Sequence, residues 1–162
     1  MSKLFLVLED IRSIYNVGAI FRTADATAVD MIYLCGHTPG PLDRFGRPVA
    51  ALHKTALGAE QTVPYQQLSS AAAVVRALKA DGVKAYAIEQ TANATDLVSA
   101  KFFADQAVAF VLGSEVPGVS TAVLAEVDQV LAIPMWGTKE SLNVSVAAGV
   151  VLYQFRTHIP PA

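Results

Sequence analysis

The chain alternates between short apolar, strand-like runs and segments whose apolar residues recur at helical spacing. The strand-like runs cover residues 3–9, 29–35, 83–89, 107–113 and 129–135. The helix-like segments cover residues 16–28, 49–58, 69–82, 120–127 and 142–158. Because parallel strands need a helical crossover between them, this order predicts a mostly parallel sheet with helices on both faces. The predicted fold class is therefore α/β.

The helix at residues 69–82 has the clearest boundaries. Serines stand at its start and Gly82 lies just past its end. Its predicted apolar stripe consists of Leu68, Ala72, Val75 and Leu78. Residues 36–48 are rich in Gly and Pro and predict a loop between the second strand and the short helix at 49–58.

Hydrophobic residues make up 53% of the 162 residues and charged residues only 16%, against about 25% in an average domain. Part of the surface is therefore expected to be covered by self-association. The longest apolar stretch, residues 144–153, is too short for the roughly 18 residues that span a bilayer. No signal peptide precedes the first strand, which predicts a cytoplasmic protein without a membrane partner.

Charge and cysteine content exclude further classes. A formal net charge of -2 argues against broad electrostatic capture of nucleic acid, so any RNA must bind a local patch. Cys35 is the only cysteine, which leaves no disulfide or cysteine-based metal cluster, and we expect it to be inert and packed near a strand end.

Ligands of such sheets bind beyond the carboxyl ends of the strands, which points to the loops after Glu9, Leu112 and Ile133. In the first loop, Asn16 either caps the following helix or belongs to a site. Arg22, two turns further on, is either a site residue or a surface charge that pairs with Asp25.

The second loop holds Gly113 and Gly118 with the lone carboxylate of Glu115 between them. It is either a ligand loop or a tight turn before the next helix, and it lacks the glycine patterns of phosphate and dinucleotide sites. The third loop leads to Ser141, Leu142 and Asn143. Two polar residues around a leucine are more than a helix cap requires, so we interpret Ser141 and Asn143 as site residues.

The three histidines show neither metal-ligand spacing nor a Ser-His-Asp order, which disfavours metal and hydrolase chemistry. One basic region is clustered, and we place it near the candidate site. It is either an RNA-binding patch or a solvated loop with scattered charge. Its members are Arg44, Arg47, His53 and Lys54.

Four segments resemble motifs of the SPOUT methyltransferases, in particular the SpoU/TrmH family of RNA ribose 2'-O-methyltransferases. They are "NVGAIFRTAD" from residue 16, "HKTALGAE" from residue 53, "LGSEVPGVS" from residue 112 and "IPMWGTKESLNVSVAAGVVLYQF" from residue 133. They occur in the family's order, and the last is the most specific. The resemblance implies the SPOUT fold, in which the C-terminal part of the sheet forms a deep trefoil knot.

The resemblance also implies that S-adenosylmethionine binds in the knot, held largely by backbone groups and without a metal. By position, its cofactor-binding residues would be Leu112, Gly113, Ile133, Met135, Ser141 and Leu142. The implied catalytic residues are Asn16, Arg22, Glu115, Ser141 and Asn143. Arg22 would take the ribose proton or stabilise the developing alkoxide electrostatically. Asn16 would orient Arg22 or the ribose, and Glu115 would hold Arg22 or shape its loop.

Family members form homodimers in which the arginine comes from the partner chain, and they often carry a separate RNA-binding domain. Here residues 1–162 resemble the catalytic domain alone. The leading hypothesis is a ribose 2'-O-methyltransferase acting on tRNA first and rRNA second. A non-enzymatic RNA-binding or ribosome-assembly factor with the knotted fold is the alternative. A doubly wound small-molecule binder has only the alternating pattern in its support.

Overall fold

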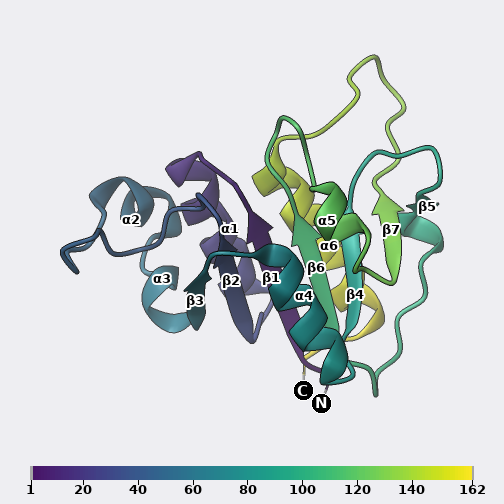
Figure 1. The fold of residues 1–162 in the computed structure, drawn as a ribbon, viewed down its shortest axis with the longest axis horizontal. Helices are drawn as coiled ribbons and strands as arrows, with labels where there is room; N and C mark the ends of the chain where they lie inside the picture. Colours follow the sequence, from purple (N-terminus) through teal and green to yellow (C-terminus); the bar gives the residue numbers. More distant parts are fainter. Residues whose placement is uncertain (1, 162) are drawn as a thin grey trace.

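The computed structural model describes residues 2–161 and contains a seven-stranded sheet in which every recorded pairing is parallel (Figure 1). The strands are β1 (Leu4–Glu9), β2 (Met31–Cys35), β3 (Tyr65–Leu68), β4 (Lys84–Ile88), β5 (Thr95–Asp96), β6 (Val108–Leu112) and β7 (Gln129–Ala132). Their order across the sheet is β3-β2-β1-β6-β4-β7-β5. The predicted α/β class with a parallel sheet is confirmed, and the trefoil knot stays a prediction.

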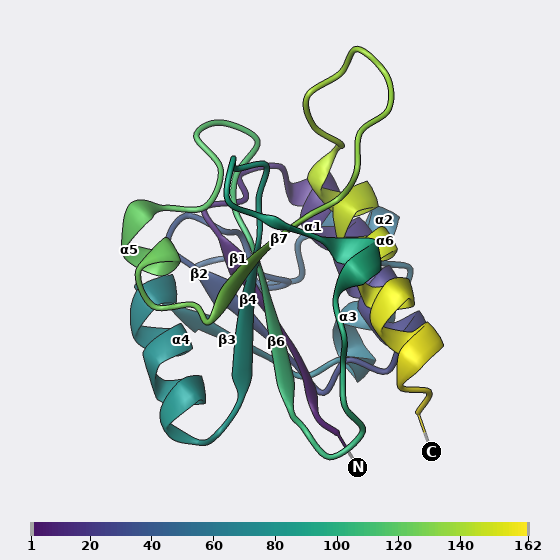
Figure 2. The same cartoon turned by 90° about the vertical axis from the view of Figure 1, so that its right-hand side faces the viewer.

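Helices cover both faces of the sheet, as the alternation predicts. They are α1 (Ile14–Ala26), α2 (Ala50–Ala56), α3 (Ala59–Thr62), α4 (Ala71–Ala80), the 3-10 turn η1 (Leu97–Ser99), α5 (Thr121–Leu124) and α6 (Val144–His158). Figure 2 shows α4 and α5 on one side of the sheet and α1, α2, α3 and α6 on the other. Among residues 2–161, no helix has both the length and the apolar character that crossing a bilayer needs.

The two faces of the sheet bury two separate cores because side chains alternate along each strand. Leu6 and Leu8 of β1 pack in the core beneath α1 and α6, whereas Val7 packs in the core beneath α4. In β4 the pattern is the same, with Tyr86 facing the first core and its alanine neighbours facing the second. The small alanine side chains leave room for α4 to pack close to the sheet.

An aromatic cluster ties α6 to the sheet. The ring of Phe102 lies 5.7 Å from Tyr86, 5.8 Å from Phe110 and 5.3 Å from Phe155, measured between ring centroids. All three pairs are near edge-to-face, which is the favoured arrangement of aromatic rings. Phe102 thereby links the segment before β6 to the closing helix.

Two of the helix starts that differ from the sequence-based predictions change the role of a named residue. Helix α1 begins at Ile14 because the hydroxyl of Ser13 accepts a hydrogen bond from the backbone N–H of Asn16. The alternative in which Asn16 caps this helix is therefore wrong, and its side chain is available for other contacts. Helix α4 begins at Ala71, so Leu68 lies in β3 instead of on the helical stripe.

Four short elements have no counterpart among the predicted segments, namely α3, β3, β5 and η1. Strand β3 lies at one edge of the sheet and β5 at the other, so each pairs with a single neighbour. Most of β3 is exposed, and its sequence "YQQL" lacks the apolar run of a buried parallel strand. Edge position thus explains why hydrophobic patterning fails to detect these two strands.

The prediction that Cys35 is packed at a strand end agrees with the structure. Cys35 is the last residue of β2 and is fully buried. Burial raises the pKa of its thiol to about 12, and the nearby carboxylates of Glu9 and Asp10 add to this effect. The thiol therefore stays protonated and unreactive at neutral pH.

Phe102 and Phe103 offer a matched test of the core, because they are adjacent but only 8% and 59% exposed, respectively. We expect Phe102→Ala to lower the free energy of unfolding by about 3–5 kcal/mol through the cavity it creates. Phe103→Ala should change it by no more than about 0.5 kcal/mol. Urea unfolding of both variants measures the difference, and equal losses would contradict the assigned aromatic core.

Candidate active site

A pocket of about 140 Å³ opens at the carboxyl ends of β4, β6 and β7, beside the first turn of α6. Loops 113–120 and 133–143 project from this end of the sheet (Figures 1 and 2). Residues of both loops line the pocket. Six of the predicted catalytic and cofactor-binding residues line the pocket, namely Leu112, Gly113, Glu115, Ile133, Ser141 and Leu142.

The strand order adds a loop to the pocket that the sequence analysis did not include. Strand β4 pairs with β6 on one side and with β7 on the other, so the loop after β4 lies between the two predicted loops. Its residues Glu89 and Gln90 line the pocket, and the side-chain amide of Gln90 donates a hydrogen bond to the carbonyl of Ile133 at 2.7 Å. Their position at the end of the predicted strand 83–89 and directly after it was the available signal.

Loop 113–120 folds back on itself through two glycines. A Cβ on Gly113 would lie only 2.3 Å from the backbone carbon of Gly118, so the two residues can approach this closely only because glycine has no side chain. Gly118 has a φ of 86°, a conformation that glycine adopts without strain. The carboxylate of Glu89 accepts a hydrogen bond from the next N–H, that of Val119, at 2.9 Å, which fixes the turn to the end of β4.

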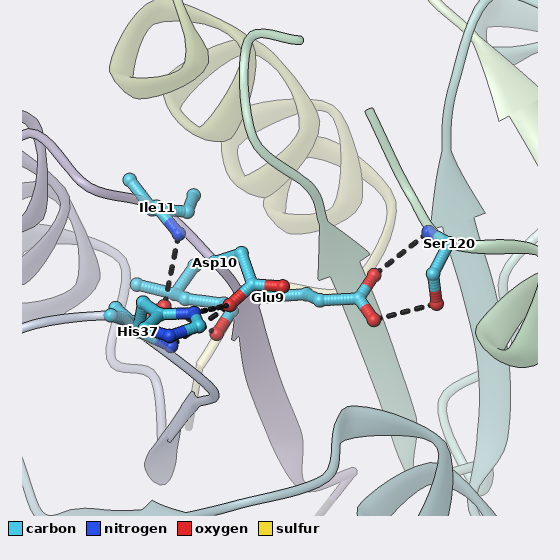
Figure 3. A network of polar contacts seen from close by, with 7 residues as sticks. Glu9, Asp10, Ile11, His37 and Ser120 are labelled. Atoms are coloured by element: carbon cyan, nitrogen blue, oxygen red, sulfur yellow. Dashed lines mark hydrogen bonds and ion pairs between the residues drawn. The ribbon is translucent and has the colours of Figure 1, made fainter. Parts of the chain in front are cut away.

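The same loop is also anchored to β1. Figure 3 shows the carboxylate of Glu9 facing Ser120, whose backbone N–H and hydroxyl donate hydrogen bonds of 2.9 and 2.6 Å to it. Ser120 in turn caps helix α5 by accepting from the N–H of Val123. Hydrogen bonds therefore hold loop 113–120 to the ends of two strands, β1 through Glu9 and β4 through Glu89.

Beside Glu9, the turn after β1 is closed by a second network. Asp10 accepts hydrogen bonds from the backbone N–H of His37 at 2.8 Å and contacts its ring nitrogen at 3.0 Å (Figure 3). The backbone hydrogen bond from His37 lowers the pKa of Asp10 below its usual value. The N–H of Ile11 donates to the buried hydroxyl of Thr38. These contacts fix the path of the chain from β1 into α1.

A chain of polar side chains joins α1, loop 113–120 and α6. The amide nitrogen of Asn16 donates to the carboxylate of Glu115 at 2.7 Å, and the amide nitrogen of Asn143 donates to the carbonyl oxygen of Asn16 at 3.2 Å. The side-chain oxygen of Asn143 accepts from the backbone N–H of Ser145 at 2.9 Å and so caps α6. Asn143 therefore caps α6 with its side-chain oxygen and contacts Asn16 with its amide nitrogen, and its interpretation as a site residue stays a prediction.

Two further predicted site residues, Met135 and Arg22, do not line the pocket. Met135 is half-buried in the third loop but is not among the residues that line the pocket. Arg22 lies outside the pocket, in a shallow groove that it forms with Ala19, Lys54 and Tyr153 among others. Its predicted contact with Glu115 does not occur within the described chain, where Glu115 is bonded to Asn16.

The groove around Arg22 depends on a close contact between two helices. A Cβ on Gly18 of α1 would lie 2.5 Å from the carbonyl oxygen of Leu52 in α2, so only glycine permits this approach. The contact brings Lys54 of α2 beside Arg22. Asp25 does not pair with Arg22, since its carboxylate accepts a hydrogen bond from the hydroxyl of Thr62 at 2.7 Å.

The four predicted RNA-binding residues divide into two groups. Lys54 lies beside Arg22, and His53 contacts Glu60 at 2.5 Å. Arg44 and Arg47 lie in the loop before α2, which extends from the molecule on the β2–β3 side (Figure 1). The expectation that this basic region adjoins the candidate site is therefore wrong for the two arginines within one chain.

Residues 2–161 contain no group of three or more His, Cys, Asp or Glu side chains placed to hold a metal ion. The described residues supply the pocket with apolar side chains, with the uncharged polar side chains of Gln90, Ser114 and Ser141, and with two carboxylates, those of Glu89 and Glu115. These features define an α/β protein with a small-molecule pocket at the carboxyl edge of a parallel sheet. The chain belongs to the SpoU rRNA methylase family, whose model matches residues 3–153.

Known proteins of this kind are similar over nearly the whole chain. The 23S rRNA (guanosine-2'-O-)-methyltransferase RlmB of Neisseria meningitidis serogroup B is 35% identical over 153 residues, which cover 94% of this chain and 58% of the relative. The chain thus spans little more than half the length of that protein. The resemblance to the SpoU/TrmH family is confirmed.

Two solved structures are also similar. The S-adenosylmethionine-bound rRNA methyltransferase of Sinorhizobium meliloti has a TM-score of 0.85 at 26% identity, covering 98% of this chain and 57% of that one. A structure described as giving insight into the 2-OH methylation of C/U34 on tRNA has a TM-score of 0.77 at 28% identity. This second likeness covers 97% of this chain and 96% of the other chain.

The anchor between Glu9 and Ser120 can be measured with a double-mutant cycle. We expect Glu9→Ala and Ser120→Ala to show a coupling of about 1 to 2 kcal/mol in the free energy of unfolding, because they remove the same hydrogen bonds. Ser70 caps α4 in the same way but has no contact with Glu9, so Glu9→Ala with Ser70→Ala should be additive. Equal coupling in both cycles would contradict the anchor.

Proposed function

We propose that this protein is an S-adenosylmethionine-dependent methyltransferase that modifies ribose 2'-oxygens in RNA. The observation that carries the proposal is the convergence of separate, glycine-containing loops on one pocket in a chain of the SpoU rRNA methylase family. The name of the Neisseria relative supports the reaction, and the Sinorhizobium structure with its bound cofactor supports the cofactor. We further propose that residues 1–162 act as one catalytic domain in the cytoplasm.

The residues at the pocket fit such a cofactor. Leu112, Ile133 and Leu142 offer an apolar wall, and Gly113 and Gly118 also line the pocket. The carboxylates of Glu89 and Glu115 favour a positively charged ligand. When bound, S-adenosylmethionine would supply an electrophilic methyl group on a cationic sulfur, a chemistry that needs no metal.

The chain itself must then orient the ribose and accommodate the charge on its oxygen. Asn16, Glu115 and Asn143 form a hydrogen-bonded chain at the rim, and Ser141 lies on the pocket wall. We assign these residues to positioning the ribose. Because a guanidinium stays protonated in proteins, we assign Arg22 to stabilising the developing alkoxide, with the proton passing to water.

Arg22 lies outside the pocket of its own chain, which supports an active site shared by two subunits. Helix α6 exposes an apolar face next to the Arg22 groove. Val146, Val150 and Tyr153 recur at helical spacing on this face and are 50%, 40% and 54% exposed. We propose that α6 packs against a second copy of the chain and that Arg22 reaches the pocket of the partner.

Two substrate classes fit this proposal. The sequence likeness to the Neisseria enzyme supports rRNA, although the match spans only 58% of that protein. The likeness to the structure concerned with C/U34 of tRNA covers both chains almost completely and supports tRNA. We therefore propose tRNA as the first substrate to test and 23S rRNA as the second.

Cofactor binding can be tested with two arginine substitutions in the same loop. Leu142 is 37% exposed and lines the pocket, whereas Trp136 is 91% exposed and does not. We expect Leu142→Arg to weaken S-adenosylmethionine binding at least about tenfold, because the guanidinium repels the sulfonium, and Trp136→Arg to leave it unchanged. Calorimetry measures both, with one cofactor expected per wild-type chain. Absent binding by the wild type would favour the non-enzymatic factor.

The shared active site can be tested by mixing two inactive variants. Arg22→Ala and Leu142→Arg should each lose methyl transfer to tRNA or 23S rRNA, since each damages a different half of the site. After subunit exchange, half of the dimers combine one variant of each kind and hold one intact site. Activity should therefore return to about a quarter of the wild-type value, assayed with labelled methyl groups. No recovery, despite proven exchange, would contradict a site shared between subunits.

A further inference from the structure

The loop before α2 ends in a tightly bonded tip, residues 43–47. The backbone N–H of Asp43 donates to the carbonyl of Arg47 at 2.8 Å, and the N–H of Gly46 donates back to the carbonyl of Asp43 at 2.9 Å. The carboxylate of Asp43 accepts from the N–H of Phe45 at 2.8 Å and from that of Arg47 at 3.0 Å. This internal bonding holds the tip in one conformation without support from the core.

The tip presents an aromatic ring between two cations. Phe45 is 66% exposed, and the guanidinium carbons of Arg44 and Arg47 lie 4.7 and 5.0 Å from its ring centroid. The side chain of Arg47 also pairs with Asp43 at 2.8 Å, whereas no carboxylate in residues 2–161 lies within ion-pair distance of Arg44. One positive charge at the tip is thus left without an anionic partner.

A preformed tip of this kind has the chemistry of a platform for an unpaired nucleotide. Aromatic rings and guanidinium planes both stack with bases, and free guanidinium groups contact phosphates. In a chain whose formal net charge is -2, the patch supplies locally the positive charge that the whole surface lacks. A protein partner would instead favour a wider apolar surface than a single ring.

We infer that Phe45, flanked by Arg44 and Arg47, stacks on an unpaired base of the RNA substrate and holds it outside the active site. The inference rests on the proposed function, because it assumes that the substrate is RNA. It assigns recognition of a single-stranded nucleotide to a residue that takes no part in methyl transfer.

The path from the tip to the Arg22 groove is short. Helix α2 follows the tip directly and has seven residues, so it is about 10 Å long. Lys54, in its last turn, lies in the groove with Arg22. An RNA strand that contacts Arg22 and Lys54 therefore reaches the tip within a few nucleotides, with cations at both ends of the path.

The test measures the affinity of each variant for a short fluorescein-labelled oligoadenosine RNA by anisotropy at several salt concentrations. We expect Phe45→Ala and Phe45→Leu to bind about 5- to 100-fold more weakly with an unchanged salt slope, because they remove stacking and no phosphate contact. Phe45→Trp should bind at least as tightly as the wild type. Arg44→Ala should weaken binding and lower the salt slope by about 1.

Phe103→Ala is the matched control, since Phe103 is also an exposed phenylalanine but lies far along the chain from the tip. It should bind oligoadenosine as the wild type does, and the duplex of this RNA with oligouridine should respond little to Phe45→Ala. If Phe45→Ala retains wild-type affinity for the single strand, the inference is wrong. The same holds if the wild type fails to bind the single strand.

Cofactor binding separates this result from failure of the proposed function. A wild type that binds S-adenosylmethionine and methylates RNA, combined with a silent Phe45→Ala, overturns only the inference. A wild type that neither binds the cofactor nor transfers methyl groups overturns the proposed function. Light scattering covers the remaining possibility, because a change from dimer to monomer in Phe45→Ala would make the ring a subunit contact and overturn the inference.

Discussion

The parallel pairing of β4 with both β6 and β7 is the constraint on which the pocket depends. Parallel strands present their carboxyl ends at one edge of the sheet, so the three following loops must share that edge. The three loops can share this edge only if one of them folds tightly. Loop 113–120 does so through the contact of Gly113 with the backbone of Gly118. Glu9 and Glu89 then hold the folded loop from two strands, which leaves the space beneath it open to a ligand.

Hydrogen bonds between polar side chains connect loop 113–120 to helices α1 and α6. Asn143 begins α6 with one end of its amide and contacts Asn16 of α1 with the other. Asn16 in turn donates a hydrogen bond to Glu115 on loop 113–120. The start of the closing helix and the rim of the pocket are therefore set by the same group, so a change at Asn143 acts on stability and on the site together.

The sequence predicts the structural features that depend on residues close together in the chain, and it fails for those that depend on contacts between distant segments. Buried parallel strands are continuous apolar runs, and α4 has a serine cap and a terminal glycine, so local patterns located these elements. Strand order is set by contacts between distant segments, and no local pattern could place β4 between β6 and β7. For that reason Glu89 and Gln90 were missed, although they lie at the end of a predicted strand and directly after it.

The positions of the cations follow from the same limit. Sequence alone grouped Arg44 and Arg47 with Lys54 because they are close along the chain, but α2 separates them in space. Arg22 shares the groove of Lys54, whereas the acidic residues Glu89 and Glu115 line the pocket. The described chain thus keeps negative charge at its pocket and positive charge on a separate surface. Such a distribution favours a cationic ligand in the first and an anionic polymer on the second, and a second subunit is what would bring the two together.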